Sequence, residues 1–353
     1  MNKERAVLAR ARRIVVKIGS RSLAADAAVP RSLAEEVRAL TDEKRSVVLV
    51  SSGAIALGAA RLGYRTRPKE MAKLQASAAA GQSVLMRRYD EAFFDQGLTV
   101  AQVLLTHADL AERDRLNNAR EAFAALLEAG AVPIVNENDT VATEEIRFGD
   151  NDQLASMVVP LVGADLLILL TDVEGVLDAD GRRISVMSER SVVGKVSSKG
   201  ERVGSGGMAS KLDAAGKARR SGAAVVIAPA GRPGVLADVV AGKDVGTLFP
   251  AIGEPLKARK HWIAYTLRPR GVLILDAGAV RAISGGRSSL LPVGVLGVRG
   301  EFRPGDSVSL VDTEGREVGR GLTRLSALDA ARVAGQTSGD DVVVHKDDLV
   351  LSP

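Results

Sequence analysis

The sequence contains no cysteine among its 353 residues and only three histidines, His107, His261 and His345. The absence of cysteine excludes disulfide bonds and thiolate-bound metals, and it is typical of a protein of the reducing cytoplasm. The histidines lie far apart in the sequence and form no zinc motif, so we interpret each as structural. Any catalysis must therefore depend on lysine, aspartate, asparagine, serine and backbone amides.

Long apolar runs are also missing. No run approaches the roughly 20 residues that cross a bilayer, which excludes a transmembrane helix, and the basic N-terminal stretch lacks the apolar core of a secretory signal. We therefore expect a cytoplasmic protein without a membrane partner. The formal net charge of +5 is mild for this length and does not indicate a dedicated nucleic-acid-binding protein.

Short apolar segments alternate with longer helical ones from about Ile14 to Phe249. Six segments predict buried strands: Ile14–Val16, Val47–Val50, Leu98–Val100, Val132–Val135, Leu166–Leu170 and Ala224–Ile227. Six others predict helices: Arg31–Leu40, Ala54–Leu62, Met71–Phe94, Arg113–Ala129, Leu154–Val162 and Ala209–Ser221. This alternation predicts an α/β fold with a doubly wound, mostly parallel sheet, in which ligands bind beyond the carboxyl ends of the strands.

The pattern changes after Pro255. Short strands are predicted between glycine-rich turns, at Gly271–Leu275, Gly294–Val298, Ser307–Val311 and Val342–Val344. A helix is expected near Leu325–Val333, because Ser326–Asp329 is a capping-box pattern. We therefore divide the chain into an α/β domain of residues 1–255, a charged linker of residues 256–269 and a small β-barrel domain of residues 270–353.

The segment from Asn136 to Asp152 is the densest polar feature. It contains one arginine, Arg147, and six acidic residues: Glu137, Asp139, Glu144, Glu145, Asp150 and Asp152. Carboxylates so close together repel one another, so the folded protein must supply water, a metal or a positively charged partner. The segment follows a predicted strand and therefore falls at the ligand edge of the sheet. The alternative is a solvated acidic loop.

Two further segments bring anion-binding groups to the same edge. Lys17 closes the first predicted strand and is followed by Gly19, which lets a phosphate approach the backbone. Ser51–Ala54 opens a helix, where unpaired amides bind anions. Taken alone, each segment also fits an ordinary structure, namely a lysine that extends from a strand end or a serine N-cap.

A glycine-rich loop and a polar pair complete the set. Gly204–Lys211 runs into a predicted helix, and glycine amides can surround phosphate oxygens while Lys211 adds a charge. The loop lacks the Gly-Lys-Ser/Thr of a Walker A motif. Thr171–Asp172 closes another strand. The alternatives are a flexible capping loop and a simple turn, but neither explains why all these segments fall at strand ends or helix starts.

Together these groups indicate phosphoryl transfer from a nucleotide, because two lysines can neutralise the moving phosphoryl group while the glycine loop holds the phosphates. The absence of an obvious catalytic base favours a carboxylate as the acceptor. A carboxylate, with a reference pKa of about 4, is already a nucleophile at neutral pH.

Six segments resemble motifs of the amino acid kinase family: Val15–Ser20, Ser52–Ala56, Asn136–Asp139, Gly149–Asp152, Leu170–Asp172 and Gly206–Lys211. The likeness spans essentially the whole chain. The pair of acidic motifs at Asn136–Asp139 and Gly149–Asp152 resembles that of the bacterial members that phosphorylate glutamate, and it distinguishes them from the acetylglutamate, aspartate, uridylate and carbamate kinases. The resemblance therefore implies ATP-dependent phosphorylation of the γ-carboxylate of L-glutamate, the first step of proline synthesis.

The resemblance also implies roles for single residues. Lys17 and Lys211 would contact the transferring phosphoryl group, with Asp152 orienting both lysines. The glutamate-binding residues would be Ser52, Asp139 and Asn151. The ATP-binding residues would be Lys17, Thr171, Asp172, Ser205, Gly206, Gly207, Met208, Ala209, Ser210 and Lys211. The implied cofactors are ATP and Mg²⁺, with the metal carried by ATP rather than by a protein site.

The family further implies a homo-oligomer, either a dimer or a tetramer, and L-proline as a feedback inhibitor. From about Arg270 the chain resembles a PUA domain, a small barrel that binds RNA in RNA-modifying enzymes. Gln336–Asp341 is shorter than in typical PUA sequences, and basic and acidic residues are equal in number from Leu267 onward. A structural or regulatory role is therefore favoured over RNA binding.

Gly19–Ser20 replaces the Gly-Thr that relatives often have, and this change retains the hydroxyl group. Two alternative functions remain open. One is a kinase of another small carboxylate, such as aspartate or acetylglutamate, and the other is a non-catalytic RNA-binding or sensor protein. The complete set of lysines and aspartate argues against the second alternative.

Overall fold

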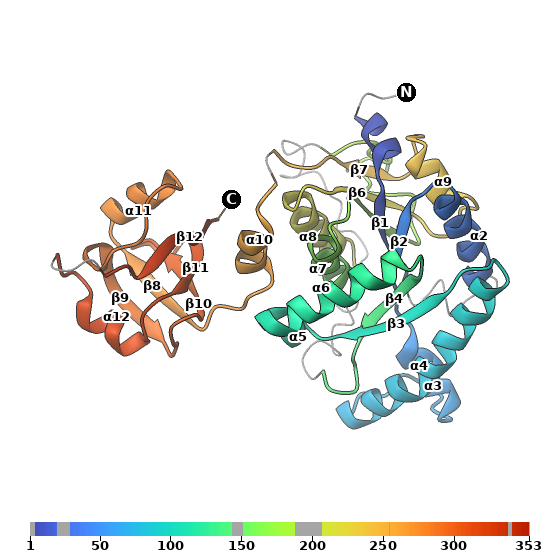
Figure 1. The fold of residues 1–353 in the computed structure, drawn as a ribbon, viewed down its shortest axis with the longest axis horizontal. Coiled ribbons are helices and arrows are strands. Elements are labelled where there is room, and N and C mark those ends of the chain that lie inside the picture. Colours follow the sequence, from blue (N-terminus) through green and yellow to red (C-terminus); the bar gives the residue numbers. More distant parts are fainter. Residues whose placement is uncertain are drawn as a thin grey trace. The chain divides into compact units, whose positions relative to one another are not determined.

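The structure is a computed structural model of the chain and describes residues 4–19, 29–142, 151–187, 207–253, 255–337 and 341–352. The chain divides into two compact units, Met1–Pro255 and Leu256–Pro353, and Figure 1 colours the second of them in orange and red. Within the described ranges, no helix is long and apolar enough to cross a membrane.

A seven-stranded sheet forms the centre of the first unit, with the strand order β3-β4-β2-β1-β5-β6-β7. Its strands are β1 (Arg13–Lys17), β2 (Ser46–Val50), β3 (Val100–Leu105), β4 (Val132–Glu137), β5 (Leu166–Thr171), β6 (Ala224–Pro229) and β7 (Thr247–Phe249). The first six strands pair in parallel, and β7 runs antiparallel to β6. The prediction of a mostly parallel α/β sheet is confirmed.

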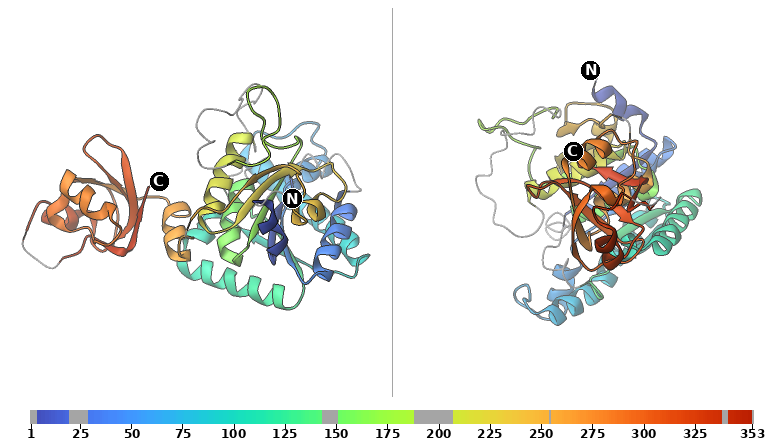
Figure 2. Two further views of the ribbon diagram at one scale, coloured as in Figure 1. Left: turned by 90° about the horizontal axis from the view of Figure 1, so that it is seen from above. Right: turned by 90° about the vertical axis from the view of Figure 1, so that its left-hand side faces the viewer.

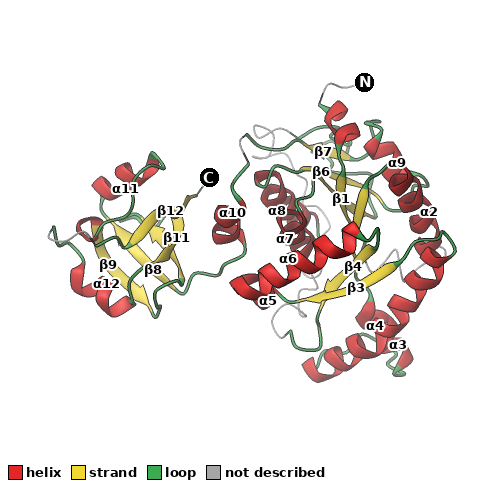
Figure 3. Cartoon of the chain, viewed as in Figure 1, coloured by secondary structure: helices red, strands yellow, loops and turns green. Residues whose placement is uncertain are grey.

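Helices lie on both sides of this sheet (Figures 2 and 3). They are η1 (Arg5–Arg10), α2 (Val29–Asp42), α3 (Ala54–Arg61), α4 (Met71–Phe94), α5 (His107–Ala111), α6 (Arg113–Glu128), α7 (Asn151–Val162), α8 (Met208–Arg220) and α9 (Val235–Val240). Alternate residues of a strand point to opposite faces. On β1, Ile14 and Val16 pack with residues of α2, α4 and α9, whereas Val15 packs with residues of α6, α7 and α8. Burial on both faces explains the continuous apolar runs in the sequence.

Several predicted boundaries in this unit are wrong. Helix α2, predicted at Arg31–Leu40, runs from Val29 to Asp42, and two other differences concern β3 and α7. The strand predicted at Leu98–Val100 begins only at Val100, because the Leu98 amide still donates to the Phe93 carbonyl at the end of α4. The rest of β3 escaped prediction because this edge strand carries the exposed Gln102, which interrupts its apolar run. Helix α7 begins at Asn151 rather than at Leu154. Asn151 and Asp152 therefore belong to the first turn of a helix, which fixes their positions.

The second unit contains a five-stranded, mostly antiparallel sheet with the strand order β12-β11-β10-β8-β9. Its elements are α10 (Ala258–Tyr265), β8 (Gly271–Leu275), α11 (Ala277–Ser284), η4 (Pro292–Gly294), β9 (Val295–Gly300), β10 (Ser307–Val311), β11 (Glu317–Thr323), α12 (Ala327–Val333) and β12 (Val344–Leu351). The side chain of Ser326 accepts a hydrogen bond from the Asp329 amide at the start of α12, so the predicted cap is confirmed.

Strand β11 escaped prediction because glycines occupy two of its buried positions. A Cβ atom on Gly321 would lie 2.3 Å from Cγ1 of Val344, so this glycine permits close packing between strands rather than a turn. The strand predicted at Val342–Val344 instead runs from Val344 to Leu351, with charged residues at its exposed positions. The segment 256–269, expected to be a linker, contains α10, which buries Ile263.

Candidate active site

Four neighbouring strands of the first sheet end at the candidate site. Strands β4, β2, β1 and β5 are adjacent and parallel, so their carboxyl ends share one edge. Asp139 and Ser52 follow β4 and β2, while Lys17 and Thr171 are the last residues of β1 and β5. Residues that are far apart in the sequence are therefore brought to a single edge, where open α/β sheets bind their ligands.

Asp152 lies between two lysines. Its Oδ1 atom is 2.7 Å from Nζ of Lys17, and its Oδ2 atom is 3.1 Å from Nζ of Lys211. The three side chains come from β1, α7 and α8, and all are buried, with Asp152 at 0% exposure. Two ammonium groups beside one carboxylate leave a net positive charge, and a buried net charge favours an anionic partner.

A chain of side-chain amides lies next to this cluster. Nδ2 of Asn151 donates to the carbonyl oxygen of Ser51 and to Oδ1 of Asn136 at 2.8 Å. Nδ2 of Asn136 in turn donates to Oε1 of Gln82, on α4, at 3.0 Å. The sequence analysis missed Gln82, because it lies mid-helix with no motif around it, and the hydrogen bond to Asn136 spans 54 positions in the sequence.

The turn after β2 is held from α4 as well. The hydroxyl groups of Ser51 and Tyr89 lie 3.0 Å apart, and burial raises the pKa of the Tyr89 hydroxyl well above its ordinary value. Gly53, the N-cap of α3, has a φ angle of 107°, a conformation that favours glycine. Ser52, between these residues, is only half-buried. The turn is thus rigid while Ser52 stays accessible.

Asp139 is half-buried beyond the end of β4. Burial raises the pKa of its carboxyl group to about 6, and the nearby charge of Arg67 opposes this change. A carboxylate that is poorly solvated in this way gains much from a cation, since an opposite charge compensates for the lost hydration. This position suits an ammonium group of a ligand.

The expected nucleotide-binding residues lie in two separate segments. Oγ1 of Thr171 is 3.3 Å from Oδ1 of Asp172, immediately after β5. Gly207 is the N-cap of α8, and Met208, Ala209, Ser210 and Lys211 form the first turn of that helix. The N-terminus of a helix favours anions. Ser205 and Gly206 lie outside the described residues, as do Ser20, Gly149 and Asp150.

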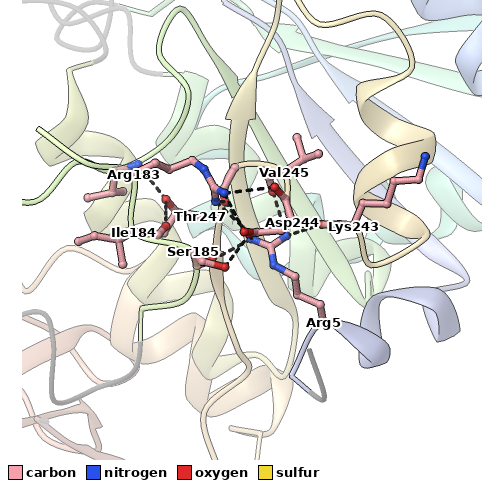
Figure 4. A network of polar contacts seen from close by, with 10 residues as sticks. Arg5, Arg183, Ile184, Ser185, Lys243, Asp244, Val245 and Thr247 are labelled. Carbon is pink, nitrogen blue, oxygen red and sulfur yellow. Dashed lines mark hydrogen bonds and ion pairs between the residues drawn. The ribbon is translucent and has the colours of Figure 1, made fainter. Parts of the chain in front are cut away.

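A buried arginine, Arg5, holds the segment that follows Thr171 at Ser185. The guanidinium group of Arg5 donates to four carbonyl oxygens, at distances of 2.8 and 2.9 Å, and is 1% exposed. Figure 4 shows Arg5 beside Asp244, which also pairs with Arg183. The hydrogen bonds from Arg183 and Ser185 lower the pKa of Asp244 to about 2. The network therefore ties Arg183–Ser185 to the start of β7.

Within the described part of the chain, no group of three or more histidine, cysteine, aspartate or glutamate side chains could hold a metal ion. The buried carboxylate of Asp152 is paired with two lysines. The exposed Asp172 stands at the same edge. Magnesium sites often use one or two carboxylates together with substrate phosphates, so this donor set fits a metal that arrives with a phosphate ligand.

Comparison with protein-family models gives two matches. Residues 12–229 match the amino acid kinase family, and residues 271–344 match the PUA domain. Among solved structures, N-acetylglutamate synthase from Neisseria gonorrhoeae is similar, with a TM-score of 0.52 and 16% identity over 71% of this chain and 63% of that one. At this identity the likeness shows a shared fold alone.

Several curated relatives are similar over nearly their full length. Glutamate 5-kinase from Thermus thermophilus is 46% identical over 97% of both chains. Glutamate 5-kinase from Pelobacter propionicus is 44% identical over 96% of this chain and 97% of its own. The protein of the same name from Nitrosococcus oceani is 43% identical over 99% of this chain and 100% of its own.

Proposed function

This chain belongs to the amino acid kinase family, and we propose that it is a glutamate 5-kinase. It transfers the γ-phosphoryl group of ATP to the γ-carboxylate of L-glutamate, which yields L-glutamyl 5-phosphate and ADP and begins proline biosynthesis. The printed names of relatives that match nearly the whole chain support this activity. A cytoplasmic location follows from the use of ATP in biosynthesis.

The observation that carries the proposal is the arrangement of Lys17, Asp152 and Lys211. Phosphoryl transfer depends on positioning and on stabilising the charge of the phosphoryl oxygens. The two lysines supply that charge, and Asp152 is a positioning residue that holds both ammonium groups at one carboxylate. Their burial excludes water, which strengthens the attraction for phosphate oxygens.

The acceptor needs no deprotonation in this reaction. A γ-carboxylate oxygen attacks the γ-phosphorus, the bond between that phosphorus and the bridging oxygen breaks, and ADP leaves with the electron pair. No proton is transferred, because the carboxylate is ionised at neutral pH. The site therefore requires lysines and amides rather than a base such as histidine.

Glutamate would be bound by Ser52, Asp139 and Asn151. Asp139 suits the α-ammonium group, because its poorly solvated carboxylate gains from a cation. The amide oxygen of Asn151 is a second acceptor, since its Nδ2 already donates twice. The half-buried Ser52 can donate to a carboxylate oxygen.

ATP would be bound by Thr171, Asp172 and the first turn of α8 with the residues just before it. We propose that Mg²⁺ comes with the phosphates, near Asp172, and neutralises part of their charge when bound. From the resemblance alone we also propose a homo-oligomer, inhibition by L-proline, and a structural or regulatory role for the PUA domain rather than RNA binding.

The direct test is incubation with L-glutamate, ATP and Mg²⁺ in the presence of hydroxylamine, which traps an acyl phosphate as a hydroxamate. We expect a hydroxamate that depends on both substrates. If the folded protein forms no hydroxamate, the proposal is wrong. Comparing kcat/KM for L-glutamate, aspartate and N-acetylglutamate decides the acceptor, and we expect L-glutamate to be preferred by at least about 100-fold, as for sites that hydrogen-bond a distinguishing polar group.

A further inference from the structure

Gln82 is connected to the candidate glutamate site through two amide hydrogen bonds. Its Oε1 atom accepts from Nδ2 of Asn136 at 3.0 Å, and Oδ1 of Asn136 accepts from Nδ2 of Asn151 at 2.8 Å. The three amides lie on three elements, α4, β4 and α7. None of the motifs in the sequence includes Gln82.

The backbone fixes which way each amide faces. The Glu137 amide donates to Oδ1 of Asn136 at 2.9 Å, so this oxygen cannot exchange places with Nδ2 without losing two hydrogen bonds. Nδ2 of Asn136 must therefore donate to Gln82. Likewise Nδ2 of Asn151 has both hydrogens engaged, by Ser51 and by Asn136, so Oδ1 of Asn151 is the atom left to meet a ligand.

Gln82 keeps this orientation at a cost. Its own Nε2 atom is buried, and within the described ranges no hydrogen-bond partner faces it. A buried donor without a partner destabilises the fold and calls for an explanation. The explanation is that the Nδ2 donor of Asn136 faces Gln82. Gln82 must therefore turn its acceptor, Oε1, toward Asn136, and this leaves its Nε2 donor without a partner among the described residues.

The packing of α4 holds Gln82 in place. A Cβ atom on the preceding residue, Gly81, would lie 1.8 Å from the carbonyl oxygen of Ala54, the first residue of α3. Such close contact sets α4 directly against the turn that contains Ser52. Tyr89, two helical turns beyond Gln82, reaches the same turn through Ser51.

We infer that Gln82 is a positioning residue: by accepting from Nδ2 of Asn136, it holds that side chain where its Oδ1 meets Asn151, so that Asn151 presents its amide oxygen to the α-ammonium group of the substrate. The inference rests on the proposed glutamate kinase activity. Its consequence is specificity, because an acceptor at this place favours acids with a free ammonium group over acids without one. Asp139 would assist in the same recognition, while Gln82 itself need not touch the substrate.

The test compares L-glutamate with glutarate, which has the same two carboxylates and no ammonium group. The readout is the ratio of kcat/KM for the two acids in the hydroxamate assay. Gln82→Met keeps the length of the side chain and removes the acceptor for Asn136. We expect the ratio to fall about tenfold, the usual worth of a hydrogen bond to a charged group, with KM for ATP nearly unchanged.

Gln82→Glu retains an acceptor for Asn136 and should preserve most of the ratio, which a merely structural role would not predict. Gln102→Met, on the exposed surface of β3, is the control and should leave the ratio unchanged. If Gln82→Met does not fold, Gln82→Ala provides the same comparison.

The inference is overturned if a folded Gln82→Met or Gln82→Ala variant keeps the wild-type ratio of kcat/KM for L-glutamate and glutarate. An equal loss of kcat/KM for both acids also leaves that ratio unchanged and overturns the inference. In both cases the proposed kinase activity stands. The wild-type protein, run in the same assay, separates the two proposals. If it makes no hydroxamate from L-glutamate, the proposed function fails, and the inference about Gln82 fails with it.

Discussion

Nζ of Lys17, the last residue of β1, lies 2.7 Å from Oδ1 of Asp152, in the first turn of α7. The contact is buried, and the other oxygen of the same carboxylate meets Lys211. One carboxylate thus sets the separation of two ammonium groups. Asp152 controls both the charge of the site and the positions of the groups that would contact a phosphoryl group.

We predict that Asp152→Asn lowers kcat by about 100-fold or more, comparable to the loss of a charge-stabilising group in other enzymes. The amide cannot accept from both lysines, so at least one ammonium moves. The free energy of unfolding should fall by about 3 kcal/mol, because two buried cations then lack their counter-charge. Hydroxamate kinetics and urea unfolding measure the two effects.

Asp213→Asn is the matched control for this change. Asp213 is on α8 and pairs with Lys217, but its side chain is 58% exposed. An exposed pair contributes at most about 1 kcal/mol, so kcat should be retained and stability should change little. Near-normal kcat in Asp152→Asn would remove the positioning role of this carboxylate.

The second prediction concerns pH and Asp139. Burial raises the pKa of this carboxyl from 3.8 to about 6, so between these values the folded chain binds more protons than the unfolded chain. The contribution of Asp139 to the free energy of unfolding therefore falls as the pH rises from about 4 to 6, and it stays low above pH 6. Asp139→Asn should be more stable than the wild type at pH 8, and this advantage should shrink toward pH 4.

Urea unfolding at both pH values measures that change, and kinetics measure its functional counterpart. Because the ammonium group of glutamate needs the ionised carboxylate, KM for glutamate should rise by about tenfold per pH unit below pH 6 in the wild type. Asp139→Asn should have a high KM that depends little on pH. A variant that is less stable at pH 8, or that keeps a low KM, contradicts this assignment.

Much of the first unit was predictable because its strands are buried on both faces. Continuous apolar runs such as Val47–Val50 mark such strands, and the limits of α4 coincide with its predicted limits. Edge and glycine-containing strands gave no such signal. β3 is interrupted by Gln102, and β11 places Gly319 and Gly321 at buried positions that in other strands carry apolar side chains.

The sequence predicted which strand ends contribute to the candidate site, but it did not predict the hydrogen bonds that connect the site to other elements. The lysines and Asp152 stand in motifs, and the order of the strands then brings them together. The contact between Gln82 and Asn136 joins α4 to β4 across 54 positions of the sequence, which no local pattern encodes. The contacts of Arg5 could not be predicted for the same reason. Its four carbonyl partners come together only when residue 185 and residues 243–246 fold against each other.

The third prediction is that Arg5→Met destabilises the protein by about 3 kcal/mol. The change leaves buried carbonyl oxygens without their donor and Asp244 without one of its cations. KM for ATP should also rise, because the segment after Thr171 loses its anchor at Ser185. Arg10→Met, on the same short helix but exposed, should change stability by no more than about 0.5 kcal/mol. Equal melting temperatures for the two variants would show that the Arg5 network is not a structural anchor.

The fourth prediction uses two helical glycines that face different surroundings. Alanine is favoured over glycine in a helix by about 1 kcal/mol. A Cβ atom added to Gly216, on α8, would have no heavy atom of the described residues within 4 Å, so Gly216→Ala should gain part of that energy. In Gly81→Ala the Cβ would lie 1.8 Å from the Ala54 carbonyl oxygen and 2.6 Å from the Gly58 nitrogen. These are backbone atoms, so α3 and α4 must separate, and the steric cost of about 3 kcal/mol outweighs the helical gain.

The separation of α3 from α4 also connects this packing to the site. Gln82 and Tyr89 would move away from Asn136 and Ser51, so folded Gly81→Ala should show a raised KM for glutamate and an unchanged KM for ATP. Gly216→Ala should show neither change. Thermal unfolding and steady-state kinetics of both variants measure the two effects. If Gly81→Ala is as stable as Gly216→Ala and binds glutamate normally, α4 does not position the amides of the site.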